Sequence, residues 1–299
     1  MLYPWLTDSY QKLCRRAFNH SLHHGLILQG IQGIGKDQFA QALSAYLLCN
    51  NKQVDGPCGQ CQACALVKAD SHPDLLQIRK EKSQIGVDQI REAIQALSKT
   101  AQLSGEKVLI IYQADDLNQA SANALLKTLE EPTANTTIML VTSQPQRFLP
   151  TIISRCEKIT LLPPTQSDAL SWLAEQGAQG DVQEILQLCA GAPLKAWGLL
   201  QQQDGLSFSE FSQQLKALQQ QQTNSWQLAN NWQQDSAMVV SWIQFWLQQK
   251  MTGITPGQQE TGWKLHQRCV QVIKQLQNPG INKAMLLYGL LELTKELKE

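Results

Sequence analysis

A glycine-rich turn near the start of the chain constrains its fold more than any other feature. The turn is Gly30-Ile-Gln-Gly-Ile-Gly-Lys36, between the apolar run Leu26–Leu28 and residues 38–43, whose apolar positions have helical spacing. Strand, turn and helix therefore come in the order of a phosphate-binding loop, in which backbone N–H groups converge on phosphate oxygens. The pattern predicts an α/β domain. The turn alone could also be an ordinary tight turn between strand and helix.

The residue after this turn departs from a working nucleotide site. In nucleotide hydrolases the lysine reaches the terminal phosphates, and a Ser or Thr hydroxyl after it ligates Mg²⁺. Here that position is Asp37, whose carboxylate would repel a triphosphate. The loop can therefore keep its fold without its chemistry, although its lysine could still attract an anion. The residues that would surround a nucleotide in this degenerate loop are Gly30, Gly33, Gly35, Lys36 and Asp37.

A second departure of the same kind lies at the end of a predicted strand, 107–112. In nucleotide hydrolases this strand ends in an Asp that holds Mg²⁺ and, in many, a Glu that activates water. Tyr112 and Gln113 take these places, and neither side chain can act as a carboxylate. Asp115 and Asp116 follow two or three residues later, beyond the predicted end of the strand.

Other apolar runs predict the rest of a sheet and its covering helices. We expect strands over 72–78, 138–143 and 159–162, and helices over 85–97 and 121–131. The strand 138–143 ends in hydroxyl side chains, among them Thr142, at the position where a related enzyme would sense a γ-phosphate.

Four of the eight cysteines form a tight cluster, Cys49, Cys58, Cys61 and Cys64. A two-residue spacing lets neighbouring sulfurs meet one ion, and four thiolates make the closed tetrahedral shell of structural zinc. The cluster therefore predicts a structural Zn²⁺ site. A redox Cys-x-x-Cys pair or an iron–sulfur cluster is the alternative. The other four cysteines stand alone, which is typical of small buried hydrophobes.

The composition narrows the classes of protein that remain. With 299 residues, 43% hydrophobic and 17% charged, the chain can form two or three globular domains. Lys plus Arg equal Asp plus Glu at 25 each, so no overall positive field draws the chain to DNA, and any nucleic-acid contact is local or shared with partners. The start lacks a secretory pattern and no segment approaches a membrane span, so we expect a cytoplasmic protein.

The last third of the chain is rich in glutamine and tryptophan. Apolar residues three and four apart predict packed helices rather than a low-complexity linker. We expect the tryptophans to lie mainly in the core, and some of them at subunit contacts, rather than to stack on nucleic-acid bases. They are Trp226, Trp232, Trp242 and Trp246.

Taken in order and spacing, four motifs resemble the clamp-loader subunits of bacterial replicative DNA polymerase III. They are the loop Gly30–Lys36, the cysteine cluster, the segment Ala122–Pro132 and the triplet Ser154-Arg155-Cys156. The resemblance is strong over residues 1 to about 165. It implies an AAA+ domain over 1–164 with a zinc module at 49–64, a helical lid over 165–206 and a helical collar over 207–299.

The resemblance also implies roles for single residues. Motor subunits of that family have Thr after the loop lysine and Asp-Glu at the end of the second motif strand, so Asp37, Tyr112 and Gln113 argue against a motor. The arginine of the Ser-Arg-Cys triplet reaches the γ-phosphate bound by a neighbouring subunit, which makes Arg155 the candidate arginine finger in trans. Family members also contact nucleotide through a lid arginine, but Leu194 and Lys195 stand at that place, so this contact is doubtful.

The resemblance thus implies a subunit without ATPase activity of its own, within the DNA polymerase III holoenzyme. It would hold structural Zn²⁺ and bind no ATP productively. Its implied partners are the motor subunits (gamma/tau) and the delta subunit in a five-subunit ring, and, through the ring, the sliding clamp and primer-template DNA. An active P-loop ATPase motor subunit is one alternative. A zinc-dependent nucleic-acid adaptor is another, and it predicts salt-sensitive DNA binding by the isolated chain.

Overall fold

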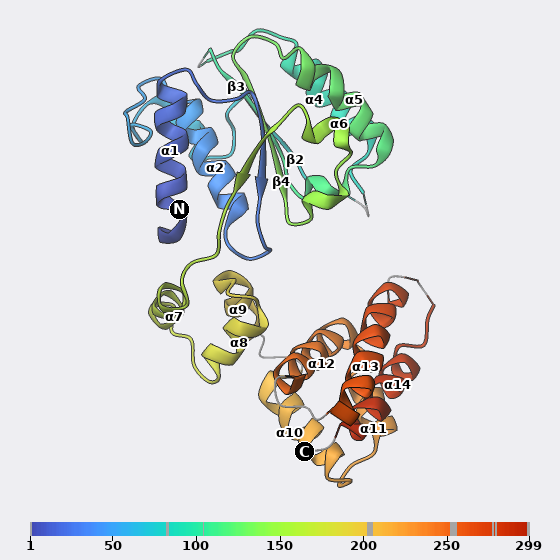
Figure 1. Ribbon diagram of the computed structural model, residues 1–299. Helices are drawn as coiled ribbons and strands as arrows, with labels where there is room; N and C mark the ends of the chain where they lie inside the picture. Colours follow the sequence, from blue (N-terminus) through green and yellow to red (C-terminus); the bar gives the residue numbers. More distant parts are fainter. Residues whose placement is uncertain are drawn as a thin grey trace. The chain divides into compact units, whose positions relative to one another are not determined.

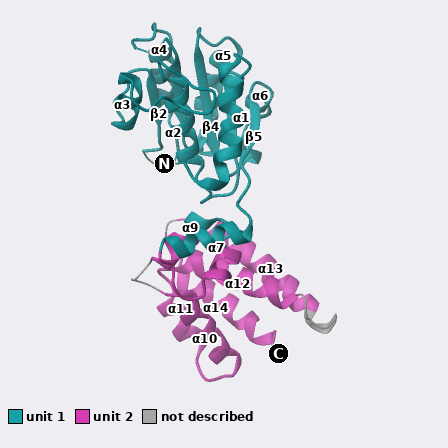
Figure 2. Cartoon of the chain, turned by 90° about the vertical axis from the view of Figure 1, so that its left-hand side faces the viewer, with its two compact units in different colours: residues 1–176, 189–195 teal, residues 177–188, 196–299 magenta. Residues whose placement is uncertain are grey.

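The structure is a computed structural model, and it describes residues 2–81, 84–103, 105–201, 206–251, 256–276, 278 and 280–297 (Figure 1). It divides into two compact units, coloured separately in Figure 2. The first comprises residues 1–176 and 189–195, and the second comprises residues 177–188 and 196–299.

The first unit is built on a five-stranded sheet in the order β2-β3-β4-β1-β5, with every neighbouring pair parallel. The predicted α/β fold is therefore confirmed. The three central strands are buried almost throughout, as expected for a parallel sheet covered on both faces. The strands are β1 (Gly25–Gln29), β2 (Leu75–Ile78), β3 (Lys107–Ile111), β4 (Thr136–Thr142) and β5 (Glu157–Thr160).

Two predicted strands are displaced at their ends. The strand expected over 72–78 begins only at Leu75, because the His72 ring and the Asp74 backbone N–H close a turn before it. The strand expected over 159–162 is β5, which pairs with β1 from Glu157 to Thr160. It is an edge strand with alternating burial, and Leu162 beyond it is 68% exposed, so apolar character alone misplaced it.

Helices cover both faces of this sheet (Figure 1). On one face lie α1 (Thr7–Phe18) and α2 (Lys36–Leu47), and α2 packs against β1, β3 and β4. On the other lie α4 (Val87–Leu97), α5 (Gln119–Glu130) and α6 (Pro150–Ile153). Because side chains alternate along a strand, Ile27 joins the core under α4 and α5 while its neighbours face the other way.

Two of these helices were expected with slightly different bounds. The segment expected from Ser121 is α5, which begins two residues earlier because the Asn118 side chain accepts the Ser121 N–H at 2.8 Å and caps it. The helix expected over 85–97 begins at Val87, since Ile85 instead forms a β-bridge with Leu117. The cysteine cluster leads into a short helix, α3 (Gln62–Lys68).

The C-terminal part of the chain is helical, as the apolar spacing predicts. Trp232 and Trp242 are 2% and 3% exposed and lie against Phe211, with ring centroids 5.3 Å apart in each pair. Trp226 lies outside the core, because it is exposed and touches Tyr288 edge-on. That some of these tryptophans lie at subunit contacts stays a prediction. The helices are α7 (Gln166–Glu175), α8 (Val182–Leu188), α9 (Pro193–Leu200), α10 (Phe208–Gln219), α11 (Ser225–Asn231), α12 (Ser236–Met251), α13 (Pro256–Gln275) and α14 (Lys283–Glu296).

The division into lid and collar stays a prediction. Its boundary at 206/207 directly follows residues 202–205, which lie outside the described residues. Helix α7 belongs to the first compact unit and α8 to the second, with α9 shared between them. Among the described helices, none combines the length and hydropathy that a membrane crossing needs.

Candidate functional site

The glycine-rich turn connects β1 to α2 at the carboxyl edge of the sheet and lines a pocket of about 570 Å³. This is where a phosphate-binding loop belongs, because the N-terminus of the following helix faces the ligand. The pocket wall includes Gly33, Gly35 and Lys36 from the loop. Gln113 and Thr142, which follow or end the neighbouring strands, also line it. Gly30 lies against the backbone of Leu161, where a Cβ would approach the carbonyl oxygen to 2.5 Å.

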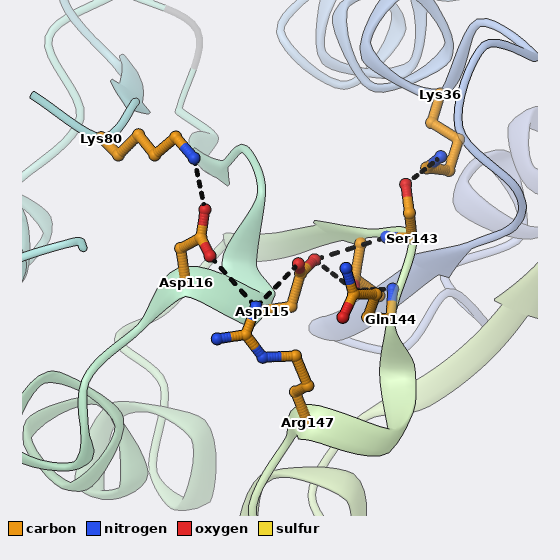
Figure 3. Close-up of polar contacts among 8 residues, drawn as sticks. Lys36, Lys80, Asp115, Asp116, Ser143, Gln144 and Arg147 are labelled. Carbon is orange, nitrogen blue, oxygen red and sulfur yellow. Dashed lines mark hydrogen bonds and ion pairs between the residues drawn. The ribbon is translucent and has the colours of Figure 1, made fainter. Parts of the chain in front are cut away.

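The loop lysine is already engaged by the protein itself (Figure 3). Lys36 Nζ donates to the Ile31 carbonyl at 2.8 Å and to Ser143 Oγ at 2.9 Å. The side chain is only 7% exposed, and this burial lowers the pKa of Lys36, although Asp37 and Asp115 oppose the shift. Two of the three N–H donors of the ammonium are therefore used by protein oxygens rather than by a phosphate.

The carboxylate after the lysine pairs with a neighbouring cation. Asp37 Oδ2 lies 3.4 Å from Arg79 Nη1, and the Arg79 guanidinium lies 3.5 Å from the centroid of the Tyr112 ring. Tyr112 is 1% exposed, its hydroxyl donates to Gln77 Oε1 at 2.8 Å, and burial raises its pKa to about 12. The tyrosine at the predicted Mg²⁺-binding position is thus packed beside Gln77 and Arg79 and is not one of the residues that line the pocket.

Gln113 turns the chain back toward the pocket. Its backbone has φ +48°, a left-handed conformation that is uncommon for a residue other than glycine. The short 3₁₀ helix after it, Ala114–Asp116, brings Asp115 and Asp116 into the pocket wall. In the sequence these two carboxylates lie beyond the predicted end of the strand, and they were not expected at the site, because the apolar pattern of the strand does not reveal the turn.

These carboxylates form a network with the opposite side of the pocket (Figure 3). Asp115 Oδ1 accepts from the Thr142 hydroxyl at 2.5 Å and from the Ser143 N–H at 3.4 Å. Asp116 pairs with Lys80 at 2.7 Å and with Arg147 at 3.3 Å. Two cations of the pocket wall, Lys80 and Arg147, are therefore paired with a carboxylate of the same chain.

Lys80 and Arg147 were not among the predicted site residues. Each is a basic residue a short distance beyond the carboxyl end of a strand, β2 and β4 respectively, and both line the pocket. Ligands of parallel sheets bind at this edge, so the positions of Lys80 and Arg147 just after a strand could have predicted that they line the site.

Other parts of the first unit cover the loop itself. The Gly33 carbonyl accepts the Leu194 N–H at 3.0 Å, and a Cβ on Gly33 would lie 2.6 Å from the Lys195 Cβ. Gly35 has φ +92°, and a Cβ there would lie 2.4 Å from the Tyr3 ring. Leu194 and Lys195 thus line the pocket, as a lid contact would, but the hydrogen bond between them and the loop is a backbone one.

The cysteine cluster has the geometry of a metal site. The sulfurs of Cys49, Cys58, Cys61 and Cys64 all lie within 4.8 Å of one another, the only such group of metal-binding side chains among the described residues. Three of their separations are 3.5, 3.9 and 4.0 Å, close to the edge of about 3.8 Å of a tetrahedron with metal–sulfur bonds of about 2.3 Å.

Backbone N–H groups point at these sulfurs, as they do around bound thiolates. The N–H of Cys58 lies 3.3 Å from Cys49 Sγ, and that of Cys64 lies 3.4 Å from Cys61 Sγ. Burial opposes ionisation of Cys61, but backbone donors and hydrogen bonds from the Cys64 and Cys58 thiols outweigh it and lower the pKa of the Cys61 thiol to about 6. The donor set and its spacing therefore fit a metal ion.

Arg155 lies far from the loop of its own chain. It lies two residues before β5, whose pairing with β1 starts at Glu157 and Leu26, so it lies at the amino edge of the parallel strands. The loop lies at the carboxyl edge, about 16 Å away along the five residues of β1. The triplet is held there by close packing, since a Cβ on Gly25 would lie 3.1 Å from Cys156 Sγ.

Comparisons with known proteins fit these observations. The family model described as "DNA polymerase III, delta subunit" matches residues 5–165, more than half of the chain. "DNA polymerase III subunit delta'" of Pseudomonas aeruginosa is 38% identical over 237 residues, 77% of this chain and 71% of that protein. The chain belongs to the delta prime family of DNA polymerase III subunits. The resemblance to the clamp-loader subunits of bacterial DNA polymerase III, predicted from four motifs, is therefore confirmed.

Other relatives of the delta prime family support the same assignment. The protein of that name from Escherichia coli K12 is 41% identical over 203 residues, which are 67% of this chain but only 61% of the relative. A crystal structure titled as a gamma subunit-related protein of DNA polymerase III from Thermotoga maritima covers 98% of this chain and 99% of its own. Its TM-score is 0.54 at 18% identity, so it supports the fold alone.

Proposed function

We propose that the chain is a catalytically silent AAA+ subunit of the replicative clamp loader that supplies Arg155 to the ATP site of a neighbouring subunit. The observation that carries this proposal is the position of Arg155, at the edge of the sheet opposite its own loop. An arginine placed there can serve only a nucleotide held by another chain. Its fixed charge and forked donors suit a transferring phosphoryl group.

The residues at the pocket support the proposal that the chain itself does not hydrolyse ATP. A nucleotide hydrolase needs a Mg²⁺ ligand after the loop lysine and carboxylates at the end of the second motif strand. Asp37 puts a negative charge where the hydroxyl would stand, Tyr112 and Gln113 carry no carboxylate, and Lys36 is bonded to protein oxygens. Loss of both features explains why the chain would have no ATPase activity of its own while working within the polymerase III holoenzyme.

The proposed assembly follows the domain division predicted from the sequence. An AAA+ domain over 1–164 would carry Arg155, a lid over 165–206 would close on the loop, and a collar over 207–299 would join the ring. The proposed partners are two kinds of subunit, the gamma/tau motors and delta, in a ring of five. That ring would load the sliding clamp onto primer-template DNA, which puts the chain in the cytoplasm with the chromosome.

Reconstitution tests this function. The chain is mixed with the motor and delta subunits, and clamp loading onto primed circular DNA is measured with and without it. The proposal expects that the chain co-elutes with the ring and that loading depends on it. A chain that stays monomeric in the mixture, with loading equally efficient in its absence, would show that the proposal is wrong.

We further propose that the cysteine cluster holds structural Zn²⁺. All four ligands come from the protein, which leaves no open position for water or substrate. Elemental analysis of the purified chain is expected to find about one zinc per chain. Replacing Cys61 with serine should abolish that zinc and lower the melting temperature, because metal binding contributes to folding.

The matched control is Cys14→Ser, since Cys14 is buried and lies outside the cluster. It should leave the zinc content unchanged. Iron and acid-labile sulfide in place of zinc would contradict the assignment of the metal, and full zinc content in Cys61→Ser would contradict the assignment of the ligands.

A further inference from the structure

We propose that Glu130 is the positioning residue for the arginine finger: its carboxylate orients the Arg155 guanidinium toward the neighbouring subunit's nucleotide. The inference rests on the proposed function of Arg155. Glu130 lies at the end of α5, in the segment Ala122–Pro132, and the sequence motifs predict no role for this residue by itself.

The guanidinium is held from two sides. Arg155 Nε donates to Glu130 Oε1 at 2.8 Å, and Nη2 donates to the same carboxylate oxygen. On the other side Nη1 donates to the Thr151 carbonyl at 2.9 Å and to Ser154 Oγ at 3.2 Å. All three nitrogens are therefore fixed, and the plane of the group is set by α5 and α6 together.

These contacts still leave capacity for a ligand. A guanidinium has five N–H donors, and the four contacts above use at most four of them. The Arg155 side chain keeps 31% of its surface exposed. At least one donor is thus free and accessible, on a group whose other donors already hold its orientation.

The support for Glu130 is rigid. The preceding residue, Leu129, is 1% exposed and packs into the core, and its Cδ2 would lie 3.3 Å from a Cβ on Gly25. The other end of α5 is capped by Asn118. The carboxylate is therefore carried on a helix whose position is fixed against the start of β1, which is what a positioning residue needs.

A purely structural role explains this pair poorly. Both side chains are substantially exposed, 31% for Arg155 and 48% for Glu130, and ion pairs of that kind contribute little to stability. A small misplacement of a catalytic group, in contrast, is costly in rate. The two roles therefore predict different results for the removal of the carboxylate.

The test uses the complete reconstituted ring, with the other motor sites inactivated at their loop lysine, and compares Glu130→Ala, Glu130→Gln and the control Glu131→Ala. Glu131 is the adjacent acid and is exposed, and it forms no ion pair with Arg155. We expect Glu130→Ala to lower kcat for ATP about tenfold with KM within about twofold and the melting temperature unchanged. Glu130→Gln, which keeps an acceptor oxygen at the same length, should lose less, and Glu131→Ala should match the wild type.

A background of Arg155→Ala separates the inference from the function beneath it. In that background Glu130→Ala should not lower kcat further, because the guanidinium that Glu130 would orient is gone. A wild-type kcat in Glu130→Ala, or a further loss in the Arg155→Ala background, would overturn the role of Glu130 while the finger stands. A wild-type kcat in Arg155→Ala would instead overturn the finger itself.

Discussion

Replacing Arg155 with alanine is expected to slow ATP hydrolysis about 10³-fold or more at the ring site that this residue completes. The reason is that the guanidinium spreads phosphoryl charge in the transition state, and its position at the amino edge of the sheet leaves it no target in its own chain. The measurement is phosphate release by reconstituted rings in which the other motor sites are inactivated at their loop lysine, so that one site is observed.

Two variants control this experiment. Arg155→Lys keeps the charge but loses the fork, so it should recover only part of the rate. Arg15→Ala removes another surface arginine, which pairs with Asp55 at 3.0 Å, and should leave the rate unchanged. Intact rings with wild-type turnover in Arg155→Ala would contradict the finger.

The second large effect concerns the stability of the degenerate pocket. Changing Tyr112 to aspartate, the residue that a motor has there, is expected to lower the free energy of unfolding by about 3 to 5 kcal/mol. The ring is 1% exposed and lies under Arg79, so the change removes aromatic packing and buries a carboxylate. Denaturant unfolding followed by circular dichroism measures the loss.

Tyr112→Phe is the matched control. It keeps the packing and removes only the hydrogen bond to Gln77, so it should cost about 1 kcal/mol. If Tyr112→Asp were as stable as the wild type, the tyrosine would not be an integral part of the core. The expected loss means that restoring an aspartate at position 112 would destabilise the domain, because Tyr112 is part of its packed core.

Local patterns predicted much of this molecule. Strand, loop and helix around Gly30–Lys36 follow from apolar runs and glycines close together in sequence, and so does the buried strand at Lys107–Ile111. The spacing of the four cysteines predicted that their sulfurs meet, and in the structure these sulfurs lie within 4.8 Å of one another. In each case the interacting groups are neighbours in sequence, so few backbone angles separate the pattern from the geometry.

The unpredicted features depend on single angles or distant contacts. One left-handed residue, Gln113, returns Asp115 and Asp116 to the pocket, and no periodicity reveals it. The Leu194 N–H reaches Gly33 across 161 residues of sequence, and Arg155 meets Glu130 across 25. Such contacts are set by how the elements pack, which sequence patterns do not specify.

The most direct measurement of the central claim is titration of the isolated chain with Mg-ATP in a calorimeter, together with its turnover. The account predicts no saturable binding at micromolar ATP and no sustained hydrolysis, because Asp37 and the Asp115–Asp116 network occupy the site with protein charges. Stoichiometric binding with steady hydrolysis that is lost in Lys36→Ala would contradict it.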